Sequence, residues 1–190
     1  MSFEQCQHVN SLMGKFSKTW FVAGGWAIDL FIGKETRKHK DIEIAIFRKD
    51  QLHLKRYFND WDFKQVKQGE FYDWGNEFLV LPIHEIHATH KLSGEKLEVL
   101  LNEIEVNDWK FRRDLRIQAP LNSVWSISET GIPYLNPEIV LLYKAKNTRE
   151  KDHQDFLAIK DLLNNKQKQW LRNALELHEP EHRWLELLVI

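Results

Sequence analysis

Residues 20–47 read WFVAGGWAIDLFIGKETRKHKDIEIAIF, and this stretch decides the fold. Residues 20–23 form a short apolar run, typical of a strand, that stops at Gly24 and Gly25. Residues 26–32 then resume the apolar spacing of a helix. A glycine pair between a strand and a helix lets the backbone approach a ligand, and the start of the helix offers free N–H groups to an anion. The turn therefore indicates a phosphate site, with a simple tight turn as the alternative.

The stretch from Asp41 to Phe47 alternates with period two and predicts a strand. On such a strand Asp41 and Glu43 point to one side, and isoleucines alternate with them on the other. Two neighbouring carboxylates repel each other unless a cation or solvent separates them, and Mg²⁺ prefers such hard oxygen ligands. The pair indicates a divalent-metal site, with a solvated strand face as the alternative.

A third acid stands on another predicted strand, residues 96–101. Glu98 lies there on the face opposite three aliphatic side chains. Between the two acid strands, residues 50–59 predict a helix, and residues 61–86 contain strand-like pieces broken by glycines.

Glycine and proline breakers at residues 131–137 mark the clearest boundary. Strand-like and helical stretches alternate before it, beginning with a predicted helix over residues 4–16, and helical spacing that predicts three helices follows it. We therefore expect a core over residues 1–130 and a helical region over residues 131–190.

The composition places the chain among folded globular proteins. Of its 190 residues, 43% are hydrophobic and 29% are charged, which is too apolar for a disordered chain. With 27 basic and 28 acidic residues the formal net charge is -1, so bulk charge favours neither nucleic acid nor an anionic membrane as a partner. No apolar run approaches the length of a membrane span, and residues 1–10 lack the features of a signal peptide. Because Cys6 is the single cysteine and can form no internal disulfide, we expect a cytoplasmic protein.

The chain resembles the polymerase-beta-type nucleotidyltransferase superfamily in its layout of a glycine pair, fifteen intervening residues, an acid-x-acid strand and a distant strand acid. Within that superfamily, residues 24–44 look like the aminoglycoside 2''-adenylyltransferase-like family. The resemblance implies an α+β nucleotidyltransferase fold, with a mixed β-sheet flanked by helices and a C-terminal helical part closing over a nucleoside triphosphate. Later similar pieces extend it to most of the chain; they lie at residues 109–114, 131–138, 141–146, 151–152 and 155–156.

The resemblance also implies roles for residues of this chain. Gly24 and Gly25 would hold the phosphates. The family's three acids, which are catalytic and bind Mg²⁺, would be matched by Asp41, Glu43 and Glu98. The family usually has aspartate at the second and third of these positions, and the longer glutamate moves a carboxylate by roughly an ångström. Slow turnover, or loss of the activity, is therefore an alternative.

Four basic residues are candidates for contacting the triphosphate. Arg37 and His39 precede the acid strand, with a solvated basic loop as the alternative interpretation. Lys144 and Lys151 belong to the helical part, with exposed helix charges as the alternative. Glu98 would be a second-metal ligand or the base.

The resemblance thus implies a Mg²⁺-dependent transfer of a nucleoside monophosphate, AMP from ATP or its equivalent from another NTP, to a hydroxyl of a small molecule such as an aminoglycoside-like antibiotic. Two alternatives stay open: nucleotidylation of a protein, as in antitoxin-type enzymes, and a nucleotide- or metal-binding module that has lost catalysis.

Two further patterns carry less weight. The histidines at positions 84, 87 and 90 do not have the spacing of a His-Glu-x-x-His zinc motif, so we set a zinc site aside. Most of the eight tryptophans are expected to pack in the core, and we place only Trp26 and Trp74 near a cleft.

Overall fold

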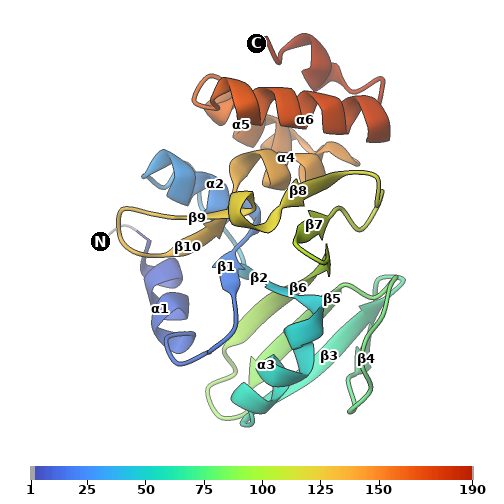
Figure 1. The fold of residues 1–190 in the computed structure, drawn as a ribbon. Coiled ribbons are helices and arrows are strands. Elements are labelled where there is room, and N and C mark those ends of the chain that lie inside the picture. The colour runs from blue at the N-terminus through green and yellow to red at the C-terminus, as the bar shows by residue number, and fades with distance from the viewer. Residues whose placement is uncertain (1–2, 190) are drawn as a thin grey trace.

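The computed structural model describes residues 3–189 and confirms an α+β fold (Figure 1). Within those residues the strands follow the order β4-β3-β5-β6-β2-β1-β10-β9, while β7 pairs with β6 and β8. The strands are β1 (Trp20–Val22), β2 (Glu43–Phe47), β3 (Trp61–Lys67), β4 (Glu70–Asp73), β5 (Glu85–His90), β6 (Lys96–Glu105), β7 (Asp108–Lys110), β8 (Gln118–Pro120), β9 (Trp125–Ile127) and β10 (Pro133–Leu135). The α-helices are α1 (Glu4–Leu12), α2 (Gly24–Ile32), α3 (Gln51–Tyr57), α4 (Pro137–Ala145), α5 (Glu150–Ile159) and α6 (Asn165–His178).

Strand β2 lies inside the sheet because its sequence is apolar on both faces. Ile44, Ala45 and Ile46 are each 0% exposed, the pattern of a strand covered on both sides. β2 pairs antiparallel with β1 and parallel with β6, so the sheet is mixed. In the parallel pair Glu43 lies directly opposite Glu98. The register therefore brings two of the predicted acids side by side.

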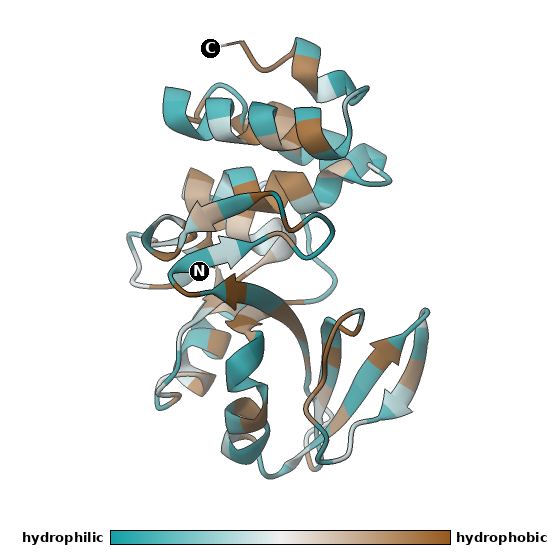
Figure 2. Cartoon of the chain, turned by 45° about the vertical axis from the view of Figure 1, so that its right-hand side comes forward, coloured by the Kyte–Doolittle hydropathy of each residue, from teal (hydrophilic) through white to brown (hydrophobic). Residues whose placement is uncertain are grey.

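The three helices predicted after residue 137 are confirmed as α4, α5 and α6. They lie together at one end of the molecule, and the strands β3 to β6 with α3 form the other end (Figure 1). Helix α4 contacts α2, α5 and α6, and its run from Ile139 to Leu142 is buried. In Figure 2 the outward face of the last long helix is mostly hydrophilic. No described helix is long and apolar enough to cross a membrane.

The predicted start of the acid strand and the predicted end of the first helix are wrong. β2 begins at Glu43, so Asp41 lies in the bend before the strand. The reason is the neighbouring strand: β1 ends at Val22, opposite Ile44, and the chain then turns into α2, which leaves Asp41 without a strand partner on that side. The first helix ends at Leu12, where the chain enters a turn, and does not reach residue 16.

Candidate active site

The turn between β1 and α2 is built around Gly24, whose φ is +60°. A β-carbon at this position would overlap Oε2 of Glu43, far inside the 3.0 Å that real β-carbon contacts respect. The N–H of Ala23 donates to the carbonyl of Glu43 at 2.8 Å, which holds the turn against β2. Glycine adopts this left-handed backbone conformation readily, and it has no β-carbon that would overlap Glu43. The turn thus leaves room for the Glu43 carboxylate at the beginning of α2.

Glu43 and Glu98 form the centre of the acidic site, since they lie opposite each other on β2 and β6. Burial raises the pKa of Glu43, and the positive charge of Lys144 opposes that rise. Burial also raises the pKa of Glu98; His87 opposes the rise, and the Glu43 carboxylate adds to it. The two carboxylates are thus desolvated neighbours, an arrangement that a bound cation stabilises.

Asp41 lies at the rim of this pair. Its side chain is 49% exposed, and Lys40 lies 4.0 Å from it. Asp41 and Glu98 line a cavity of about 520 Å³ beside α1. Glu43 lines a different cavity of about 420 Å³, which we call the main cavity because the glycine turn lines it. The carboxylate of Asp41 still contributes to the raised pKa of Glu98. The strand register therefore sets Glu43 beside Glu98, while Asp41 shares a cavity with Glu98 and is more exposed.

Strand β5 adds two residues to which the sequence assigned no role, Glu85 and His87. His87 lies opposite Glu98 in the antiparallel β5–β6 pair. Its Nε2 is 2.7 Å from Oε1 of Glu85, and its Nδ1 is 3.9 Å from Oε1 of Glu98. Ligand atoms of these three residues lie within 4.8 Å of one another, close enough to hold a metal ion. The histidine spacing alone gave no reason to keep a metal site here, because the contact of His87 with Glu98 depends on the pairing of two strands.

The predicted basic residues near the glycine turn are paired with buried acids. Arg37 donates to both carboxylate oxygens of Asp155, at 3.0 and 3.1 Å. Lys144 lies 2.7 Å from Asp152 and 2.9 Å from Asp155. Although burial alone would raise the pKa of Asp155, the bond from Arg37 and the charge of Lys144 lower it. This network connects α4 and α5 to the loop that precedes β2.

His39 and Lys151 have different surroundings. His39 packs against Gly25, where a β-carbon would lie 2.7 Å from its ring, and its Nε2 is 2.6 Å from Asp29. Lys151 is exposed on α5, although its charge is among those that lower the pKa of Glu43. Of the four predicted basic residues, Lys144 alone lines the main cavity.

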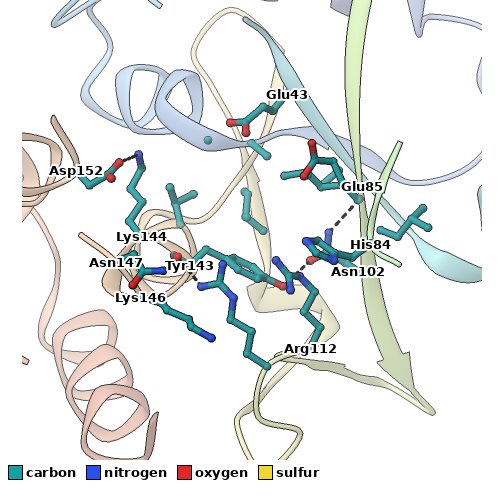
Figure 3. Close-up of a pocket in the computed structure, with 18 of the residues that line it drawn as sticks. Glu43, His84, Glu85, Asn102, Arg112, Tyr143, Lys144, Lys146, Asn147 and Asp152 are labelled. Carbon is teal, nitrogen blue, oxygen red and sulfur yellow. Dashed lines mark hydrogen bonds and ion pairs between the residues drawn. The ribbon is translucent and has the colours of Figure 1, made fainter. Parts of the chain in front are cut away.

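The main cavity measures about 420 Å³ and lies between the sheet and α4 (Figure 3). Glu43, which lies against Gly24, lines one part of it. Arg112 and Lys146 line the part opposite Glu43 (Figure 3). The expectation that Trp26 and Trp74 lie near the cleft is wrong, since neither lines the cavity. Both are buried, because Trp26 packs on His39 at 4.3 Å and Trp74 packs edge to face on Phe63 at 5.7 Å.

The family model described as aminoglycoside-2''-adenylyltransferase matches residues 6–159. Among solved structures, the chain is similar to the lincomycin-bound lincosamide antibiotic adenylyltransferase LnuA, with 18% identity, a TM-score of 0.58, and 84% of this chain and 98% of that one covered. It is also similar to ANT(2")-Ia in complex with adenylyl-2"-tobramycin, with 16% identity, a TM-score of 0.59, and 91% and 98% covered. No curated protein sequence matches it. The two structural matches confirm a nucleotidyltransferase-type fold.

Proposed function

The chain belongs to the aminoglycoside-2''-adenylyltransferase family, and on this premise we propose that it transfers a nucleoside monophosphate, AMP from ATP, to a hydroxyl of a small molecule. The observation that carries the proposal is the position of Glu43 and Glu98, directly opposite each other and beside the glycine turn. Family membership supports the reaction class, and this geometry supports where the reaction takes place.

The acidic site fits a divalent cation. Glu43 and Glu98 present oxygen ligands, and burial with mutual repulsion raises the pKa of Glu98, which makes a nearby positive charge favourable. Asp41, at the rim, adds a third carboxylate. Mg²⁺ bound by these three residues would neutralise charge on the triphosphate.

The residues of the chain have separate tasks in this scheme. The N–H groups at Gly24 and Gly25 and the ammonium of Lys144 bind the triphosphate, because they offer donors and positive charge at the beginning of α2. Glu98 is also the base that accepts the proton of the acceptor hydroxyl, so it has the roles of ligand and base. The acceptor oxygen bonds to the α-phosphorus as the bond to pyrophosphate breaks. Arg37 acts indirectly by positioning α5 through Asp155.

The relatives indicate the size of the acceptor. Those two structures hold lincomycin and an adenylylated tobramycin, which are small hydroxyl compounds. A cavity of about 420 Å³ has the usual size for a ligand of this kind. We therefore place the acceptor in the main cavity and regard an antibiotic-like hydroxyl compound as the first class to test.

The test is transfer of label from α-³²P-ATP in the presence of Mg²⁺ to a panel of lincosamides, aminoglycosides and anionic hydroxyl compounds such as glycerol 3-phosphate, with pyrophosphate release measured in parallel. We expect release that requires both Mg²⁺ and an acceptor, and a labelled acceptor as the product. Glu98→Gln should abolish transfer, whereas Glu129→Gln, which removes the same charge from an exposed loop, should keep it. Nucleotide binding without pyrophosphate release under all these conditions would refute the enzymatic proposal.

A further inference from the structure

Two neighbouring arginines reach the main cavity without forming an ion pair to any described residue. Arg112 and Arg113 follow β7, and their guanidiniums lie 5.4 and 5.6 Å from the centre of the Tyr143 ring. Within residues 3–189, neither has a carboxylate oxygen within 4.0 Å. Arg113 donates to the carbonyl of Tyr143 at 2.8 Å, whereas the guanidinium of Arg112 makes no hydrogen bond in that part of the chain. Arg112 is therefore the free donor of the pair.

This lack of partners is unusual for desolvated arginines. Burial lowers the pKa of both Arg112 and Arg113, and both line the cavity. Glu85 opposes this fall for Arg112 and Glu179 opposes it for Arg113, but neither acid is close enough to form an ion pair. By comparison, the buried Arg48 is matched by Glu103 at 2.6 Å and by two backbone carbonyls. A partly desolvated charge without a counter-charge costs stability, and a ligand that supplies the counter-charge recovers it.

The positive charges of the cavity fall into two groups. The charges that act on the pKa of Glu43 are those of Lys144, Lys151 and Arg149. They lie near the glycine turn, where we have placed the triphosphate. Arg112 instead helps to lower the pKa of His84, although burial is the larger cause of that lowering. Figure 3 shows Arg112 across the cavity from Glu43, so this arginine and its neighbour Arg113 lie in the part of the cavity away from the triphosphate.

A third cation, Lys146, lines the same part of the cavity as Arg112 (Figure 3). Its side chain is exposed, and no ion pair within residues 3–189 involves it. Two adjacent guanidiniums and one ammonium form a surface that binds an oxyanion through charge-assisted hydrogen bonds. The same surface repels a polyamine.

We propose that Arg112, Arg113 and Lys146 form an oxyanion subsite for the acceptor, so that the preferred acceptor is a hydroxyl compound bearing a phosphate or carboxylate group rather than a polycation. This proposal rests on the proposed function, because it assigns the substrate class of that reaction. The phosphate chemistry could also come from the nucleotide, and the experiment separates the two sources.

The experiment measures binding without relying on turnover. Glycerol 3-phosphate is titrated into the protein, followed by NMR, with glycerol as the uncharged control and tobramycin as the polycation. Each titration is repeated with a saturating non-hydrolysable ATP analogue and Mg²⁺. We expect glycerol 3-phosphate to bind in both conditions and more tightly than either control. Arg112→Gln should weaken it roughly 10- to 100-fold, the loss typical of a charge-assisted contact.

Matched variants separate this subsite from a general effect of charge. Arg112→Lys keeps the charge without the planar fork and should retain part of the affinity. Arg56→Gln removes an exposed arginine on α3 and should change nothing. Lys146→Gln alters an exposed side chain and should weaken binding even if Arg112→Gln does not fold. All variants should keep the affinity of the wild type for the ATP analogue.

Two results would overturn the proposal. If the ATP analogue displaces glycerol 3-phosphate, or if Arg112→Gln weakens the analogue instead, the subsite belongs to the nucleotide. If tobramycin binds as tightly as glycerol 3-phosphate, the acceptor is not selected by negative charge. Absence of pyrophosphate release with every acceptor would instead refute the proposed function. The binding titrations would still decide whether the three cations bind an oxyanion.

Discussion

Replacing Gly24 with alanine tests the most specific feature of the site, the contact of the turn with Glu43. The φ of +60° at Gly24 imposes a strain of roughly 1–2 kcal/mol on any residue with a β-carbon. Gly33→Ala is the matched control, because Gly33 has a φ of +82° and nothing within 4 Å of a β-carbon. Backbone strain alone should therefore lower the melting temperature of both variants by roughly 2 to 8 °C.

The two variants should differ in what happens to Glu43. The β-carbon that Gly24→Ala introduces would overlap Oε2 of Glu43, so the carboxylate must move by roughly an ångström or more. A displacement of about 1 Å at a catalytic group can cost about 10²-fold in rate. We expect pyrophosphate release to fall at least about 100-fold in Gly24→Ala and to remain near the wild-type rate in Gly33→Ala.

The assay combines initial rates of pyrophosphate release with the shift in melting temperature that Mg²⁺ produces. Adding Glu43→Asp to Gly24→Ala shortens the acid by one methylene and should recover about tenfold in rate, because it relieves the overlap. Equal rates for Gly24→Ala and Gly33→Ala would refute the argument that Glu43 must lie against the turn. Equal Mg²⁺ shifts in the two variants would contradict it independently of the activity.

Three further predictions concern ionisable groups. Asp155→Asn should destabilise the protein by about 3 kcal/mol at pH 7, because it leaves Arg37 and Lys144 without their shared acid. Since the pKa of Asp155 is lowered from 3.8 in the folded state, its contribution is present at neutral pH and lost as pH falls below about 4, so urea unfolding should show a flatter pH dependence in the variant. Mg²⁺ at about 100 times its dissociation constant should stabilise the wild type by about 2.7 kcal/mol in a thermal melt, and Glu98→Gln should lose most of that gain. Cys6 is 0% exposed and burial raises the pKa of its thiol to about 12, so it should react with iodoacetamide at pH 8 only after unfolding in urea.

Each of these three predictions has an outcome that would contradict it. A pH dependence of unfolding identical in Asp155→Asn and wild type would show that the acid contributes nothing to the network. If Mg²⁺ stabilises Glu98→Gln as much as it stabilises the wild type and the control Glu129→Gln, Glu98 does not bind the metal. Labelling of Cys6 in the native protein at the rate of the unfolded chain would contradict its burial.

The sequence by itself was sufficient for the elements whose signals are local. The apolar run before Gly24, the buried isoleucines of β2 and the helical spacing after residue 137 each depend on neighbours a few residues apart. The family resemblance was readable for the same reason, since its most specific residues fall within residues 24–44. The exact start of β2 was not readable, because it depends on where the partner strand ends.

Only the tertiary structure decided which charged groups meet. Arg37 and Asp155 are 118 residues apart and join through two hydrogen bonds, and His87 reaches Glu98 because β5 pairs with β6 in one register. Arg112 lies over Tyr143 because β7 returns toward α4. Local periodicity predicts which face a side chain occupies, but pairing between distant segments decides what lies opposite that face, and the electrostatics of this site depend on that pairing.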